Sequence, residues 1–312
     1  MSYKRLGMIV LMVLAVVIGA LIYIRDNVIE KPHPALDITD LSALYQAEDE
    51  IEEARALRGM PDAQPAEVVT AQPPDLPMVA IVFDGLPDRA LTSRFLDVLA
   101  RHKAPAVFFV EGANAADQPE TIEAIHEAGQ EIGNYTFVGL VGVEKQPVEE
   151  QLAQICRAQK AIVTFGQDPP RFFRAPRTQY SHELLLSVKA AGIPYAVDAN
   201  TVFQEEGVET KEAAALQANA LPMGSILAIP ISRVVEPKVD APVVVDSKPA
   251  VDMKPTIKDN QAAKHPPKAD LADKLDWFLS ALEGRGIQFA PLGQYCNPHQ
   301  VPAIPLPVKE GE

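Results

Sequence analysis

The sequence predicts an α/β protein: a parallel sheet or barrel covered by helices, in one domain that follows a single membrane-spanning helix. Three observations predict this. From residue 79 onward, short apolar strand signals alternate with helical signals, as they do in parallel βαβ units. The apolar run at 79–84 ends abruptly on Asp84 and Gly85, as strands do where α/β enzymes display their chemistry. Residues 6–24 contain no charged side chain.

Composition limits the partners. A chain of 312 residues that is 47% apolar can bury a large core. Its formal net charge of -14 repels phosphate and anionic lipid, which argues against nucleic acid as a partner. Uncharged or cationic ligands fit this charge better.

The uncharged segment predicts a membrane anchor. As a helix, residues 6–24 would span about 28 Å of hydrocarbon. Lys4 and Arg5 precede the segment, so the bias of basic residues places the N-terminus in the cytoplasm and the rest of the chain outside. A cleaved signal peptide is the alternative, but the run is longer than a usual signal-peptide core and no clear A-x-A cleavage site follows it. We therefore assign residues 1–30 to a cytoplasmic stub and the transmembrane anchor.

Residues 31–77 are interpreted as a stalk. Both ends are rich in proline, and residues 41–60 have apolar side chains at helical spacing with an acidic face. Two interpretations stay open for this helix. It is either a segment that packs on its own domain, which we favour, or a helix that binds a partner or pairs with itself.

The predicted domain covers residues 78–293. Strands are expected at 79–84, 106–111, 131–137 (strand or turn), 171–175, 195–198, 225–231 and 287–292. Helices are expected at 89–103, 121–128, 147–165, 182–191, 211–221 and 271–285. Residues 233–268 repeat Lys-Pro and Val-Asp pieces without an aromatic residue, which predicts a flexible insertion. A Pro-rich tail at 294–312 follows the last strand.

Five motifs in order resemble the polysaccharide deacetylases of carbohydrate esterase family four, also known as the NodB homology domain. VFDGLPD (82–88) resembles TFDDGPD, PAVFFV (105–110) resembles PATFFV, and GQEIGNYT (129–136) resembles GHEIGNHT. FRAPR (173–177) resembles FRPPY, and GSILAIP (224–230) resembles the GSIxLxH strand. The resemblance implies a distorted, incomplete (β/α) barrel. It also implies a hydrolase that removes N-acetyl groups from a glycan such as peptidoglycan, using zinc or another divalent metal.

The chain differs from this family at the positions of the metal ligands. The resemblance assigns the catalytic base to Asp84 and its arginine partner to Arg174, and both are present. The metal-ligand positions hold Gly85, Tyr135 and Gly139, and the position of the catalytic acid holds Pro230. None of the six histidines stands at a spacing that would replace the lost pair. We therefore expect no metal cofactor.

Two readings of the remaining residues stay open. Asp84 and Arg174 are either remnants of catalysis or a structural ion pair, and we favour the ion pair. Tyr135, Phe137, Pro176 and Tyr180 are candidate glycan-binding residues, although the aromatic rings could equally fill the space of the metal. A shifted site of Asp84, Asp88 and Asp198 would offer only oxygen ligands, which suit magnesium or calcium rather than zinc.

Cys156 and Cys296 are candidates for one disulfide, which an outward-facing domain would permit. Two buried, unpaired small side chains are the alternative.

The sequence thus predicts a single-pass protein of the bacterial inner membrane with a periplasmic deacetylase-like domain. Its expected role is non-catalytic glycan binding or assembly in the cell envelope. The alternatives are an active deacetylase with an atypical site, and a module that binds an envelope protein.

Overall fold

The computed structural model describes residues 46–165, 168–231 and 269–296. The predicted anchor at 6–24, the insertion at 233–268 and most of the tail lie outside these residues. Among the helices that are described, none is long and apolar enough to cross a membrane.

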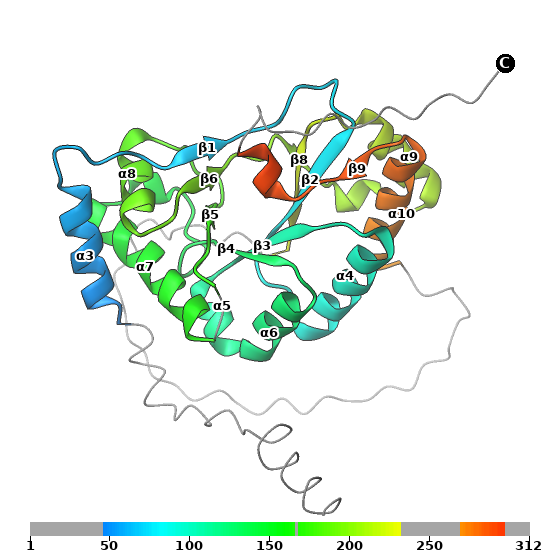
Figure 1. Cartoon of the computed structure of the whole chain (residues 1–312). Coiled ribbons are helices and arrows are strands. Elements are labelled where there is room, and N and C mark those ends of the chain that lie inside the picture. Colours follow the sequence, from blue (N-terminus) through cyan, green and yellow to red (C-terminus); the bar gives the residue numbers. More distant parts are fainter. Residues whose placement is uncertain (1–45, 166–167, 232–268, 297–312) are drawn as a thin grey trace, which may run out of the picture. The chain divides into compact units, whose positions relative to one another are not determined.

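One parallel sheet organises the domain (Figure 1). Its strands follow the order β1-β6-β5-β4-β3-β2-β8-β7, and β9 pairs with β2 off this path. The strands are β1 (Glu67–Val69), β2 (Met78–Asp84), β3 (Ala106–Val110), β4 (Glu131–Asn134), β5 (Phe172–Phe173), β6 (Tyr195–Val197), β7 (Thr201–Val202), β8 (Ile226–Pro230) and β9 (Gln288–Phe289). Within the described chain the path keeps two ends, at β1 and β7, so the predicted α/β architecture is present as a curled, open half-barrel.

Helices pack on the outer face of this sheet. They are α3 (Glu48–Arg58), α4 (Arg89–His102), α5 (Gly112–Asp117), α6 (Pro119–Glu127), α7 (Val148–Thr164), α8 (His182–Ala190), α9 (Lys211–Ala220) and α10 (Leu271–Gly284). Three short 3-10 helices are also described: η2 (Val143–Lys145), η3 (Glu205–Gly207) and η4 (Leu292–Tyr295). Sequence periodicity predicted α4, α7, α8, α9 and α10 to within two residues, because each has a clear amphipathic face or a capping residue.

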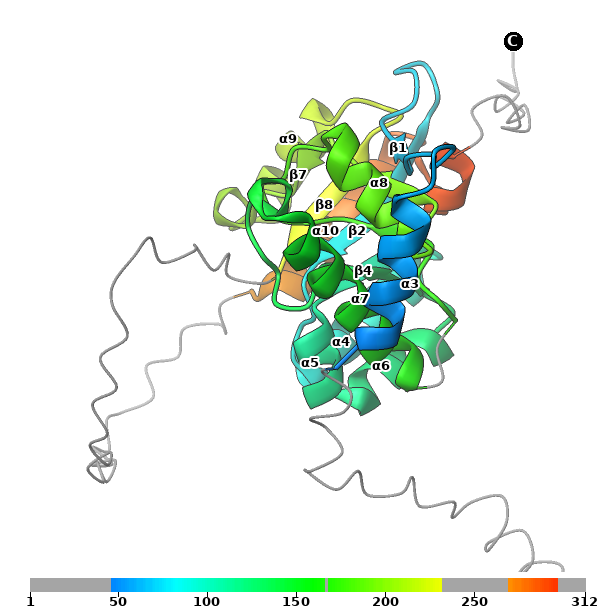
Figure 2. The same cartoon turned by 90° about the vertical axis from the view of Figure 1, so that its left-hand side faces the viewer.

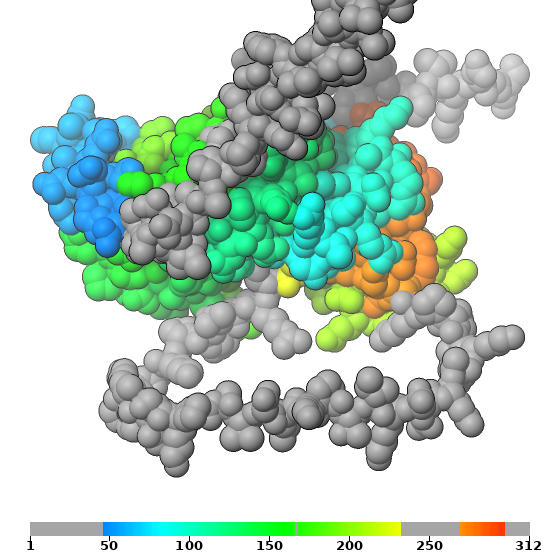
Figure 3. Space-filling model, turned by 90° about the horizontal axis from the view of Figure 1, so that it is seen from below, coloured from blue at the N-terminus to red at the C-terminus, as the bar shows by residue number. Residues whose placement is uncertain are grey.

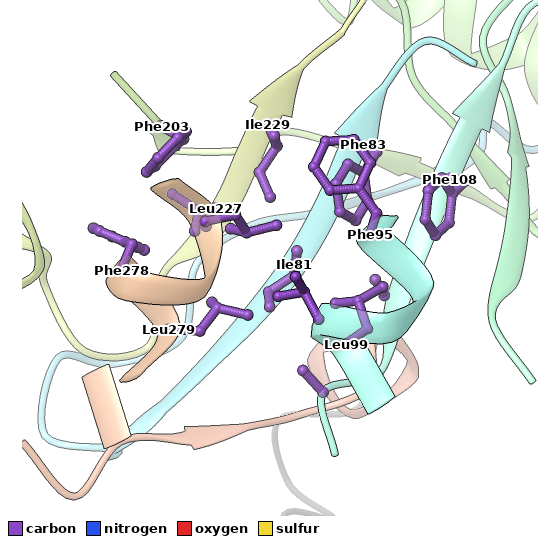
Figure 4. Close-up of a cluster of buried hydrophobic side chains, with 14 of the residues drawn as sticks. Ile81, Phe83, Phe95, Leu99, Phe108, Phe203, Leu227, Ile229, Phe278 and Leu279 are labelled. Carbon is purple, nitrogen blue, oxygen red and sulfur yellow. The ribbon is translucent and has the colours of Figure 1, made fainter. Parts of the chain in front are cut away.

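The central strand β2 has two faces with different roles. Val79, Ile81 and Phe83 belong to the cluster under the helices, where Phe83 stacks on Phe108 with ring centroids 4.3 Å apart (Figure 4). Met78, Ala80 and Val82 belong to the opposite cluster, inside the curl of the sheet. Because side chains alternate along a strand, Asp84 lies on the same inner face as Val82.

The N-terminal part of the described chain belongs to this domain. Strand β1 pairs with β6, and Ala54 of α3 is buried in a cluster with Leu152 and Cys156 of α7. The atoms of α3, in blue, lie against those of the green helices (Figure 3). Strand β1 and helix α3 precede the boundary predicted at residue 78, and both contact the elements that follow it. A three-residue strand carries too little periodicity to be recognised before its pairing is known.

Polar contacts complete the attachment of α3. Arg55 pairs with Glu149 at the start of α7, and Arg58 pairs with Glu183 of α8. Lys160 Nζ lies 2.9 Å from Glu50 Oε1. This arrangement agrees with the interpretation that the acidic helix packs on its own domain.

The predicted disulfide is not formed. Cys156 and Cys296 are both free, and they belong to different buried clusters, beside α3 and inside the curl of the sheet respectively. A long helix and a segment after the last strand give no sequence signal of their separation in space, so only the packing decides this point.

We expect both thiols to react slowly while the protein is folded. Burial raises the pKa of Cys156 to about 12 and that of Cys296 to about 11, so little thiolate is present at neutral pH. Both folded values lie above the ordinary value of 9.0. The stability that burial of the neutral thiols contributes should therefore be complete below pH 9.0 and decline as the pH approaches 11 to 12.

The measurement is a thiol titration of unreduced protein at pH 8, with and without denaturant. We expect both thiols to react rapidly only after unfolding. Unfolded protein that shows no reactive thiol before a reductant is added would contradict this and restore the disulfide.

Candidate functional site

Polar side chains converge inside the curl of the sheet, at the carboxyl ends of four neighbouring strands. Asp84 ends β2, Glu111 follows β3, Tyr135 follows β4 and Arg174 follows β5. The strands are parallel, so these four ends meet at one edge. Each side chain has the same parity as an inner-face residue of its strand, which directs it into the curl rather than toward the helices.

Asp84 and Arg174 form a bidentate ion pair. Arg174 Nε donates to Asp84 Oδ1 at 2.7 Å, and Arg174 Nη2 donates to Asp84 Oδ2 at 3.1 Å. The two side chains are only 12% and 13% exposed, so water screens the pair weakly. Both carboxylate oxygens of the predicted base are therefore already engaged. The structure brings the two predicted catalytic residues together.

The guanidinium is also fixed from its other side. Arg174 Nη1 donates to the carbonyl oxygen of Val197 at 3.1 Å, and the Tyr180 hydroxyl donates to the same oxygen at 2.7 Å. Burial acts to lower the pKa of Arg174, but the charge and hydrogen bonds of Asp84 outweigh it and raise that pKa above its usual range. Tyr180 thus lies beside the ion pair, as a neutral hydroxyl whose pKa burial raises.

Tyr135 lies beside the same ion pair and is 4% exposed. Burial, followed by the negative charge of Asp84, raises the pKa of Tyr135 above its usual range. The phenol therefore stays protonated at physiological pH. A protonated phenol is a poor metal ligand, so Tyr135 does not replace the histidine that the family resemblance places there.

Glu111 is a member of this site that the sequence did not predict. It is 4% exposed, and its Oε2 accepts a hydrogen bond from the Leu86 amide at 3.0 Å. A β-carbon added at Gly139 would lie 3.3 Å from Glu111 Cγ. The Glu111 side chain thus borders the space that a side chain at residue 139 would enter. The motif PAVFFV ends one residue before it, which is why pattern comparison did not find it.

The backbone at two former ligand positions has a conformation that suits glycine. Gly85 has φ 104° and Gly139 has φ 66°. Residues with a β-carbon rarely adopt such angles, because the side chain approaches the backbone too closely. Neither residue has a donor side chain, and the backbone angles at both positions disfavour a residue that has one.

The loop after β4 is held rigidly in spite of these losses. Asn134 is fully buried; its Oδ1 accepts from the Thr136 amide at 2.9 Å, and its Nδ2 donates to the carbonyl oxygen of Ile155 at 2.9 Å. Thr136 has φ 63°, which is unusual for a residue with a branched side chain. Gln154 Oε1 accepts from the amides of Phe137 and Val138. These contacts position Tyr135 without any metal.

The other predicted residues differ in burial and contacts. Phe137 is half-buried, and its ring lies where a β-carbon on Gly112 would be, so it packs against α5. Pro176 is buried, and its carbonyl accepts from Gly142 at 3.4 Å. Pro230 is exposed and pairs in register with Asp84. Whether any of them binds a glycan stays a prediction.

The donor set does not fit a divalent metal. Gly85 and Gly139 offer no side-chain ligand, Tyr135 stays protonated and Asp84 is engaged by Arg174. The shifted oxygen site is not assembled either, because Asp88 caps α4 through Leu91 while Asp198 is exposed. Across the described ranges, no group of three histidine, cysteine, aspartate or glutamate side chains could hold a metal ion.

Comparison with known proteins finds similarity over the part of the chain that contains Asp84, Glu111, Tyr135 and Arg174. Residues 71–196 match the family model for polysaccharide deacetylase. A chitooligosaccharide deacetylase of Sinorhizobium fredii is 34% identical over 119 residues, which cover 38% of this chain and 54% of the relative. A peptidoglycan-N-acetylmuramic acid deacetylase of Bacillus subtilis is 28% identical over 148 residues, which cover 46% of this chain and 32% of the relative. The chain thus spans about half, or less, of the length of these curated relatives.

Solved structures share the fold. A pseudoenzyme of carbohydrate esterase family 4 from Bacillus anthracis matches with a TM-score of 0.56 at 15% identity, covering 76% of this chain and 71% of that one. A mutant of that pseudoenzyme with restored enzymatic activity matches equally well. A family 4 carbohydrate esterase of Bacillus subtilis matches with a TM-score of 0.55 at 17% identity, covering 75% of this chain and 92% of that one.

Proposed function

Because the chain contains a polysaccharide deacetylase domain, we propose that it is a non-catalytic member of that family, which binds a glycan of the cell envelope without hydrolysing it. The observation that carries the proposal is the state of the ligand positions. Gly85 and Gly139 lack donors and have positive φ angles, and Tyr135 is a buried, protonated phenol. Without three ligands on one side of a metal, there is no group to polarise an acetamide carbonyl or to activate water.

The glycan part of the proposal is supported by the relatives and by the polar residues at the carboxyl ends of the strands. Several curated relatives are named as deacetylases of chitooligosaccharides or peptidoglycan. The loop after β4 keeps a rigid conformation, and the aromatic side chains of Tyr135 and Tyr180 lie beside the ion pair. A pre-formed polar edge suits the hydroxyl groups of a sugar ring.

We further propose that residues 6–24 anchor the chain in the bacterial inner membrane, with the domain in the periplasm. The uncharged run and the preceding Lys4 and Arg5 support this topology. Extraction of native membranes at alkaline pH tests it. We expect the chain to stay with the membrane fraction, and release into the soluble fraction would contradict the anchor.

The test of the non-catalytic role combines metal analysis, acetate release and glycan binding on the purified full chain. We expect less than stoichiometric zinc, no acetate from chitooligosaccharide or peptidoglycan, and retention on insoluble peptidoglycan. An active family member serves as the positive control for acetate release. The proposal is overturned by stoichiometric zinc together with acetate release that is lost in Asp84→Asn, because that result identifies a working deacetylase with an atypical site.

A further inference from the structure

Helices α3 and α7 lie side by side (Figure 2), and a groove lies between them. Its volume is about 480 Å³, within the range of ligand-binding clefts. The apolar lining comes from α3, α7 and the end of α8: Ala54, Leu57, Cys156, Val163, Ala190 and Ala191.

The groove exists because α3 is attached by small residues and ion pairs. Ala47 and Ala54 are the buried apolar residues of the α3 segment, and they share one cluster with Leu152, Cys156 and Ala190. The charged contacts of Arg55, Arg58 and Glu50 connect α3 to its neighbours at separate points. Between them the two helices leave space that their own side chains do not fill.

Large apolar side chains remain exposed along this space. Leu57 is 41% exposed and Val163 is 38% exposed. The lining residues of α3 recur at 50, 53, 54 and 57, and those of α7 recur at 156, 159, 160 and 163. Both sets follow helical spacing, so the groove runs along two helix faces. Such a groove accepts the apolar face of a third helix.

The rim of the groove is acidic on the α3 side. The acids of α3 that line the groove are Glu50 and Glu53. Glu53 is exposed, whereas Glu50 pairs with Lys160, the cation among the lining residues. Favourable interaction with the helix dipole accounts for acids in the first turn of α3. It does not account for Glu53, or for the exposed Leu57 four residues later.

From this geometry and charge we propose that the groove docks an amphipathic helix of another protein, with leucine-like side chains on one face and lysine or arginine along its border. Apolar side chains would fill the space between Leu57 and Val163, and the basic border would face Glu53. A second copy of α3 would bring acids against acids, and an anionic lipid surface would meet the same repulsion. This interface is separate from the proposed glycan site.

The test uses two synthetic peptides and the full chain in detergent. One is a fourteen-residue amphipathic Leu/Lys helix, and the other is a Lys/Ser peptide with the same charge. We expect the Leu/Lys peptide to bind at least ~10-fold more tightly, because only it offers an apolar face. Hydrogen exchange should then slow in α3 and in the second half of α7.

Two groove variants and two matched controls locate the binding. Leu57→Ser/Val163→Ser should weaken binding of the Leu/Lys peptide ~10-fold or more, whereas Leu216→Ser, at a leucine 72% exposed on α9, should not. Glu53→Lys should weaken it at low salt, whereas Glu127→Lys at the exposed end of α6 should have less effect. Because all these side chains are exposed, the variants should keep the unfolding midpoint of the parent.

Three results would overturn the proposal. Equal binding of the Lys/Ser peptide would mean that general charge attraction explains the affinity. Equal losses in the groove variants and their controls would place the binding elsewhere. No binding of the Leu/Lys peptide to the folded chain would mean that the groove does not accept a helix, including the case in which another part of the chain covers it.

Discussion

Replacing Arg174 by methionine is expected to lower the free energy of unfolding by about 3–5 kcal/mol, because the change leaves the charge of Asp84 buried without a partner. The Asp84 side chain is 12% exposed, and both of its oxygens receive hydrogen bonds from Arg174. Methionine keeps most of the volume, so the loss reports the charge rather than a cavity. The carbonyl oxygen of Val197 also loses one donor, although Tyr180 still bonds to it. Urea denaturation of the purified chain gives the difference.

Two further variants make this expectation specific. Arg89 pairs with Glu120 at the surface, where the two side chains are 75% and 68% exposed, so Arg89→Met should change stability by no more than about 1 kcal/mol. The double variant Asp84→Leu/Arg174→Met removes both charges and should recover a large part of the loss. Arg174→Met and Arg89→Met with equal effects would contradict a structural role for the buried pair.

Restoring the missing ligands is expected not to restore a zinc site. The variant Gly85→Asp/Tyr135→His/Gly139→His supplies one carboxylate and two imidazoles at the positions that the family resemblance assigns to the metal. However, Gly85 and Gly139 have φ of 104° and 66°, where each new side chain costs about 1–2 kcal/mol. The histidine at 139 must also enter space bordered by Glu111. We therefore expect a less stable protein with less than one zinc ion per chain.

The Glu111 side chain provides the control for this experiment. Adding Glu111→Ala to the three ligand changes removes the neighbour of residue 139, and zinc occupancy should then rise. Tyr135→His alone serves as the matched single change, since Tyr135 does not require a positive φ. Elemental analysis after dialysis measures the metal, and urea denaturation measures the strain. If the variant with only the three ligand changes binds one zinc ion tightly, the backbone at residues 85 and 139 accepts side chains at less cost than its φ angles indicate.

The proximity of Asp84 and Arg174 could be predicted from the sequence, because both residues belong to motifs whose order is specific. Asp84 ends an apolar run that could only be a buried strand, and Arg174 follows a Phe-Phe strand three motifs later. Parallel strands bring their carboxyl ends together, so the two residues had to lie at one edge. Their direct ion pair follows from that placement.

The position of Glu111 in the site and the packing partners of α3 were harder to predict from the sequence, for physical reasons. Glu111 lies one residue beyond a motif that otherwise describes a strand, and only the close approach of Gly139 makes its position significant. The acidic helix has little apolar surface of its own, so its packing on α7 and α8 depends on ion pairs between residues far apart in the chain. Local periodicity carries no information about such pairs.

The sequence by itself determined the α/β architecture, the positions of the longer strands and helices, and the absence of donors at residues 85 and 139. These properties depend on local patterns: side-chain alternation, helical spacing and the chemical identity of single residues. Only the tertiary structure decided that Cys156 and Cys296 lie in different clusters, that Glu111 borders Gly139, and that α3 leaves a groove against α7. Each of these depends on how segments distant in sequence approach one another, which close packing of the whole core determines.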